Sequence, residues 1–148
     1  MQRFLSIAMA LTCLSLSATV GAQMTPLGTW RNVDDKTGEA KAEIQIVEQG
    51  GVLSGRIVRT LRNDPNARKQ CDECRDDRKG QPIVGLEIIR GVRQEGSDNL
   101  WAGGGKILDP ENGKEYTVRL VPLDGGQSLQ VRGYIGPFYR TQLWQRIP

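Results

Sequence analysis

The chain has 148 residues, a formal net charge of +3 and no histidine. Its 20 lysine and arginine residues are mixed with 17 aspartate and glutamate residues, so the charge is too small and too dispersed to indicate nucleic-acid binding. The lack of histidine removes the usual general base and the most common metal ligand.

The first 22 residues have the composition of a secretion signal. Arg3 provides the positive start, an apolar segment covers residues 4–16, and small residues lead to Ala22. The apolar segment is short for a membrane span. A lipidated Cys13 is disfavoured because Thr12 stands where a small residue is expected. We predict a signal peptide over residues 1–22 and a single domain over residues 23–148, which is periplasmic or secreted and has no stable membrane insertion.

The rest of the chain alternates strand-like segments with turns. In residues 40–48, apolar and polar side chains alternate with the period of two that is typical of a half-buried strand. The sequence Asp109-Pro110-Glu111-Asn112-Gly113 is a strong turn signal. No window has helical periodicity. The expected strands, in chain order, cover residues 28–33, 40–48, 52–61, 86–94, 100–108, 115–121, 128–135 and 139–146.

About eight short strands with mostly tight connections predict an all-β fold. Neighbouring strands joined by tight turns pair antiparallel, and a closed barrel removes the exposed edges of such a sheet. Gly55, Gly103–Gly105 and Gly133 suit the bends of a barrel wall. We predict a small antiparallel up-and-down β-barrel, with a sandwich of the same strands as the alternative.

Two cysteines remain after removal of the signal, Cys71 and Cys74. An even number in an exported protein favours a disulfide. The same spacing occurs in redox pairs and in half of a zinc site. A redox pair needs a helix after the first thiol, and the polar flanks here favour turns. A zinc site needs four ligands, so we predict a local structural disulfide and no metal site. Redox activity, metal binding and free thiols are the alternatives.

The motifs of catalysis are missing from the sequence. Ser54, Ser97 and Ser128 do not lie in a nucleophile elbow. Gly103–Gly105 lacks the helix that would hold a phosphate, and the 109–115 segment lacks the final glutamate of a calcium loop. We expect a protein that is not an enzyme, with no catalytic residue and no cofactor.

Seven motifs follow one another along the chain: Gly28-Thr29-Trp30-Arg31, Asp35-Lys36-Thr37-Gly38, the Cys71/Cys74 pair, Pro82-Ile83-Val84-Gly85-Leu86, the 105–116 segment, Val131-Arg132-Gly133-Tyr134-Ile135-Gly136 and the 140–146 segment. Taken together and in order, they resemble one bacterial family of exported proteins, that of domain of unknown function 2147 (DUF2147). The resemblance implies a lipocalin-like barrel in an exported protein, and it implies no established activity. Gly28-x-Trp30 with a late arginine is also similar to the lipocalin signature, in which the arginine packs over the tryptophan; Arg140 and Arg146 are the candidates.

Two arginines continue the apolar alternation of their strands. Arg59 shares the face of Leu53 and Ile57, and Arg90 shares the face of Ile88. Two cations inside an apolar barrel would be costly unless an anion pairs with them. We therefore predict a site for a small apolar or amphipathic acid, with the alternative that both arginines lie near strand ends and reach water or an internal carboxylate. The predicted ligand contacts are Arg59, Arg90, Leu53, Ile57, Ile88, Val118 and Val131.

Two classes of function follow. The first is a periplasmic barrel that binds a small apolar or amphipathic ligand. The second is an envelope protein with a filled barrel, which meets a protein partner through the 62–81 loop or through exposed aromatic residues such as Phe138 and Tyr139. The volume of the barrel interior separates the two, because a filled interior excludes the first.

Overall fold

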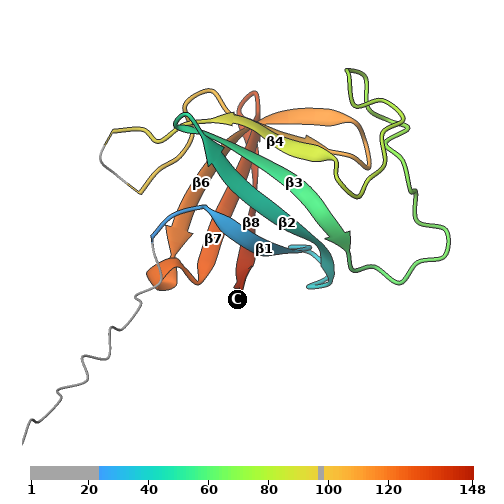
Figure 1. Cartoon of the computed structure of the whole chain (residues 1–148), viewed down its shortest axis with the longest axis horizontal. Helices are drawn as coiled ribbons and strands as arrows, with labels where there is room; N and C mark the ends of the chain where they lie inside the picture. The colour runs from blue at the N-terminus through green and yellow to red at the C-terminus, as the bar shows by residue number, and fades with distance from the viewer. Residues whose placement is uncertain (1–23, 97–98) are drawn as a thin grey trace, which may run out of the picture.

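The computed structural model describes residues 24–96 and 99–148, so the predicted signal peptide over residues 1–22 lies outside the described residues. Within the described part, no helix is long and apolar enough to cross a membrane. A single 3₁₀ turn, η1 (Asp124–Gly126), accompanies the strands (Figure 1). The strands are β1 (Gly28–Val33), β2 (Ala40–Gln49), β3 (Val52–Thr60), β4 (Glu87–Val92), β5 (Lys106–Asp109), β6 (Lys114–Leu123), β7 (Ser128–Ile135) and β8 (Phe138–Ile147).

The eight strands form one closed barrel. Each strand pairs antiparallel with the next, and β8 returns to pair with β1, where Trp30 lies opposite Arg146. The predicted all-β barrel is confirmed, and closure excludes the sandwich alternative. Because the strands run up and down, their connections divide between two ends of the barrel.

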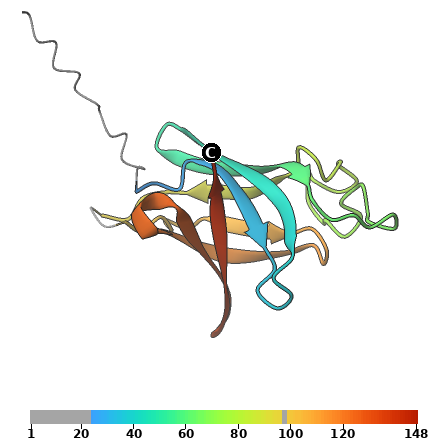
Figure 2. The same cartoon turned by 90° about the horizontal axis from the view of Figure 1, so that it is seen from below.

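We call these the plugged end and the loop end. The plugged end holds residues 24–27, η1 and the turn at Gly50–Gly51 between β2 and β3. The loop end holds the β1–β2 turn at residues 34–39 and the long β3–β4 loop at residues 61–86, which extends away from the barrel in Figures 1 and 2.

Inward side chains of all eight strands meet in one core. Trp30 on β1 and Trp144 on β8 have no exposed surface, and Ile44, Leu120 and Leu129 of the same cluster are equally inaccessible. Burial of a large apolar side chain contributes about 1.5–3 kcal/mol, so this alternation of inward apolar residues accounts for much of the driving force for closure.

The predicted strand over residues 100–108 is shorter in the structure. Gly103 and Gly104 have φ values of 45° and 82°, in the left-handed region that glycine adopts readily. Gly105 then leads into β5, and its amide bonds back to the carbonyl of Ala102 at 2.7 Å. The glycine run is therefore a tight turn between strands and not a bend within one.

Candidate functional site

Trp30 and Arg146 close the plugged end. The Trp30 indole Nε1 donates a hydrogen bond to the carbonyl of Pro26 at 2.7 Å. The Arg146 guanidinium carbon lies 4.2 Å from the centroid of the Trp30 ring. Of the two candidate arginines, Arg146 makes the predicted contact, while Arg140 at the loop end pairs with Asp35. The guanidinium of Arg146 also donates to the backbone carbonyls of Thr25, Leu27 and Gly126.

The predicted apolar contacts of a ligand belong to the packed core. All of them are at most 4% exposed and join one cluster with the two buried tryptophans. Two surface recesses of the described residues, of about 490 and 400 Å³, are lined by other side chains. The side chains predicted to contact an apolar tail are therefore buried against one another, and neither recess exposes them. The residues concerned are Leu53, Ile57, Ile88, Val118 and Val131.

Arg59 lies on the outer face of the barrel, contrary to the predicted alternation. Ile57 pairs with Ile44, whereas Arg59 pairs with the next residue of β2, Glu43, so β3 holds one extra residue at Val58. Such a bulge reverses the face of the residues that follow it. The Arg59 Nε donates to Glu43 at 3.0 Å, and this hydrogen bond lowers the pKa of the Glu43 carboxyl.

Arg90 also lies outside. Leu53 pairs with Val92 and Gly55 pairs with Ile89, so β4 has an extra residue beside Gly91, whose φ is 69°. A Cβ on Gly55 would contact the Ile89 side chain at about 3 Å, which identifies Ile89 as the inward residue of this pair. Arg90 therefore points away from the core.

Carboxylates already neutralise the Arg90 guanidinium, which donates to both Asp77 oxygens at 3.0 and 2.9 Å and to Glu87 at 2.5 Å. Together these contacts raise its pKa. Arg59 and Arg90 thus each have a carboxylate partner, as the alternative expectation allowed, but these carboxylates lie on the outside of the barrel and not in its interior. The predicted site placed both arginines in the barrel interior, and they do not lie there. Contact of Arg59 or Arg90 with a ligand stays a prediction.

The long β3–β4 loop is a folded unit held by a disulfide and a buried arginine. Cys71 and Cys74 form the predicted disulfide, and both are fully buried. Arg78, only 1% exposed, pairs with Asp76 and with Glu115 of β6 at 2.5 and 2.8 Å. Sequence reasoning did not single out Arg78, because nothing in its polar surroundings indicates burial.

A chain of ion pairs links elements at the loop end. Lys41 on β2 contacts Asp34 at 3.0 Å and Glu111 of the β5–β6 turn at 3.6 Å, and Glu111 continues to Arg62 at 2.5 Å. The pKa of the Asp34 carboxyl is held well below its usual range. The main cause is its hydrogen bonds from the backbone N–H groups of Thr37 and Lys36, and the Lys41 side chain lowers it further. Ion pairs therefore link the elements at the loop end, and this end of the barrel is polar.

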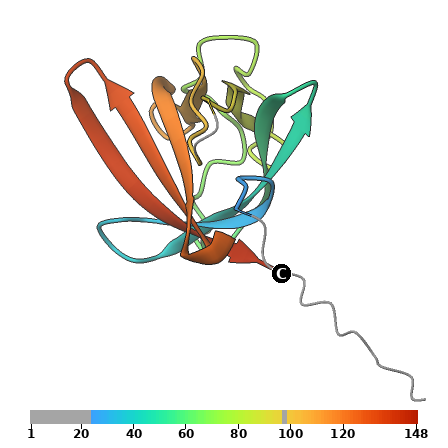
Figure 3. The same cartoon turned by 90° about the vertical axis from the view of Figure 1, so that its left-hand side faces the viewer.

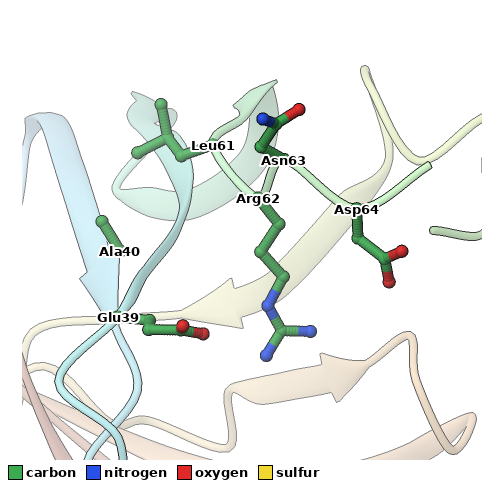
Figure 4. A pocket seen from close by; sticks show the side chains of 6 residues that line it. All are labelled: Glu39, Ala40, Leu61, Arg62, Asn63 and Asp64. Carbon is green, nitrogen blue, oxygen red and sulfur yellow. The ribbon is translucent and has the colours of Figure 1, made fainter. Parts of the chain in front are cut away.

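The larger recess lies beside this chain of ion pairs. Figure 4 shows the Arg62 side chain extending between those of Glu39 and Asp64. Ala40 and Leu61 supply the small apolar part of its lining. Since most of the lining is polar and the recess is open, it suits water or a small polar molecule better than an apolar tail.

The β7–β8 hairpin collects exposed apolar side chains. Ile135, Phe138, Tyr139 and Leu143 are 49%, 73%, 62% and 50% exposed, and they make up half of the large exposed apolar side chains of the described residues. Figure 3 shows the hairpin as a two-stranded ribbon that extends past the rest of the barrel. Sequence reasoning identified Phe138 and Tyr139, because the turn at Gly136-Pro137 places them at a hairpin tip.

Comparison with known proteins places the chain in a family. A family model described as an uncharacterized protein conserved in bacteria (DUF2147) matches residues 28–146. No curated protein matches the sequence. Among solved structures, protein HP1028 from Helicobacter pylori, described as belonging to the lipocalin family, is similar with 15% identity, a TM-score of 0.70 and coverage of 85% of each chain.

The family model spans the whole barrel, from the start of β1 to the arginine that covers Trp30. The similarity to HP1028 has low sequence identity and shows the fold alone. The chain is a member of the bacterial family DUF2147, and its fold is lipocalin-like.

Proposed function

We propose that this protein is an exported, non-catalytic binding module that meets a protein partner through the outside of its barrel. The packed interior supports this proposal. Trp30 and Trp144 are fully buried in one cluster with the side chains where an apolar ligand was predicted, so a ligand there would have to displace packed side chains. The lack of histidine and the absence of catalytic motifs argue against chemistry as the function.

The exposed β7–β8 hairpin is the observation that carries the proposal. Monomeric proteins rarely expose grouped apolar side chains, and such groups mark interaction surfaces. Ile135 and Phe138 are paired at the tip of the hairpin, so their side chains form one projecting apolar end. We propose that this tip enters a hollow on the partner.

Two features support export. The first 22 residues have the pattern of a signal peptide. The Cys71–Cys74 disulfide is of a kind that persists in oxidising compartments such as the periplasm. The proposed place of action is therefore the periplasm or the outside of the cell.

The hairpin can be tested by replacing Ile135 and Phe138 with serine in the full chain. We expect the variant to fold, because both side chains are exposed, and to lose about tenfold or more of its cross-linked complex in periplasmic extracts, since buried aromatic and aliphatic residues dominate interface energies.

The matched control replaces Val47 and Val84 with serine. These valines are 48% and 55% exposed but lie outside the hairpin. The control should keep the complex. Equal yields of complex from the two double variants would contradict the proposal that the hairpin makes the contact.

A small ligand at the loop end is a second candidate, favoured by one observation. The buried Oδ1 of Asn32 has no hydrogen-bond partner among the described residues, and such an orphan acceptor is costly. Asn32 pairs with Ala42 near the loop end of the barrel wall. A donor group of a small amphipathic ligand would satisfy it, and such a ligand would be retained in a native mass spectrum of the purified protein.

A further inference from the structure

The outer surface of β6, β7 and β8 carries arginine and tyrosine side chains in one cluster. Arg119 on β6 lies directly opposite Arg132 on β7, and Tyr134 lies directly opposite Tyr139 on β8. We call this surface, together with Lys106 on β5, the arginine–tyrosine face. It is built from four consecutive strands of the barrel wall.

The two arginines are held in place by aromatic rings. The Arg119 guanidinium carbon lies 5.2 Å from the centroid of Tyr134, and that of Arg132 lies 4.8 Å from the centroid of Tyr139. The two tyrosine rings are 5.7 Å apart. Arg132 Nε also donates to the Thr141 hydroxyl at 2.8 Å, so the side chain is fixed while its terminal nitrogens remain available.

In the part of the chain that the structure describes, no carboxylate balances these charges. Among the described residues, neither Arg119 nor Arg132 forms an ion pair, and strands β7 and β8 contain no aspartate or glutamate. The single acid of β6, Glu115, pairs with Arg78. Arginines on the neighbouring strands β3 and β4 differ in this respect. Arg56, Arg59 and Arg90 each contact a carboxylate.

Like charges directly opposite each other on neighbouring strands destabilise a sheet. The pairing of Arg119 with Arg132 is therefore a cost that the fold itself does not require. Residues that reduce stability are commonly kept for function. An anionic partner would offset the repulsion, and a guanidinium group can donate two parallel hydrogen bonds to a carboxylate.

We propose that the arginine–tyrosine face binds an acidic segment of a partner protein. This inference rests on the proposed function and names the chemistry of the partner. Arginine and tyrosine are enriched where proteins bind proteins. The three cations of the face are fewer than the cluster of about four to eight basic residues that is typical of binding to anionic membranes.

The test uses the full chain and a short synthetic peptide of alternating glutamate and threonine, with the glutamine analogue as the control peptide. Binding is measured by titration with NMR detection. We expect the acidic peptide to shift the amide signals of residues 117–121, 130–134 and 139–143. Higher salt should weaken the binding, because exposed charges are screened.

The variant R119E/R132E should lose about tenfold or more of the affinity for the acidic peptide. The control variant K36E/K69E changes the net charge by the same amount at two exposed lysines that form no ion pair among the described residues, and it should keep the affinity within about twofold.

R119Q/R132Q removes the repulsion without adding acids, so it should fold, and it should also lose the binding. R119K/R132K should lose part of the affinity because lysine lacks the planar fork.

Several results would overturn the inference. Equal binding of the glutamine peptide, or unchanged binding by R119E/R132E, would exclude recognition of carboxylates. Binding to phosphatidylglycerol vesicles but not to the peptide would assign the face to a membrane. A dimer that R119E/R132E abolishes in sedimentation would assign it to a second copy of the chain. Since the hairpin variant I135S/F138S leaves these arginines intact, loss of the complex in that variant alone would refute this inference and retain the proposed function.

Discussion

Among the described residues, Arg78 is almost fully buried and Arg146 is partly buried, and each has a different kind of acceptor. Arg78 donates to the carboxylates of Asp76 and Glu115, whereas Arg146 donates only to backbone carbonyls and covers the Trp30 ring. A buried charge without such partners would be very costly. Each arginine therefore fixes the segments that supply its acceptors.

Replacement of Arg146 with methionine should destabilise the protein by about 2–4 kcal/mol, because the cation–π contact is lost and three partly buried carbonyl hydrogen bonds lose their charged donor. The free energy of unfolding in urea measures the effect. Arg68→Met, which removes an exposed ion pair with Glu73, should change it by less than about 1 kcal/mol. Equal effects of the two substitutions would show that Arg146 does not hold the plugged end.

At the scale of elements, the sequence predicts the strands well and their faces less well. Alternation identified the inward residues of β2 and β6, because those strands keep a regular register over most of their length. It failed for Arg59 and Arg90, since β3 holds one extra residue against β2, and β4 has two register shifts against β3 that each add a residue. A bulge depends on the pairing with a neighbouring strand, so local periodicity cannot reveal it.

Some residues of the candidate surfaces could be predicted from the sequence and others could not. Phe138 and Tyr139 could be predicted from the turn that precedes them, because a hairpin tip is exposed. The pairing of Arg119 with Arg132 could not, since it depends on the register between β6 and β7. The burial of Arg78 depends on how the β3–β4 loop folds back onto β6, which no local pattern specifies.

The β3–β4 loop should loosen in acid. The side-chain hydrogen bond from Arg78 lowers the pKa of Asp76 to about 2 from its ordinary value of 3.8. Because the pKa in the folded state is the lower one, the charged carboxylate contributes stability above pH 3.8, and this contribution is lost as the pH falls toward 2.

Amide NMR signals of residues 61–86 measure this change. They should shift as the pH falls through that range, and Asp76→Asn should produce similar shifts at neutral pH. Asp72→Asn is the control, because the Asp72 carboxylate forms no ion pair among the described residues. Loop signals that are the same in wild type and in the Asp76 variant at neutral pH would contradict the role given to this ion pair.

At the scale of the whole molecule, the barrel presents its distinctive features on the outside. The plugged end is covered by Trp30 and Arg146, inward apolar side chains are buried in one core, and the loop end is joined by ion pairs. The apolar hairpin tip and the arginine–tyrosine face adjoin each other on β7 and β8. These outer features are the basis of the proposal that the protein contacts another macromolecule.

Native mass spectrometry of the protein purified from its own periplasm tests this account most directly. We predict the mass of the chain without residues 1–22, together with a complex that contains a second, different polypeptide and no small-molecule adduct. A lipid or other small molecule retained by the monomer would contradict the filled barrel and would favour the ligand site at the loop end.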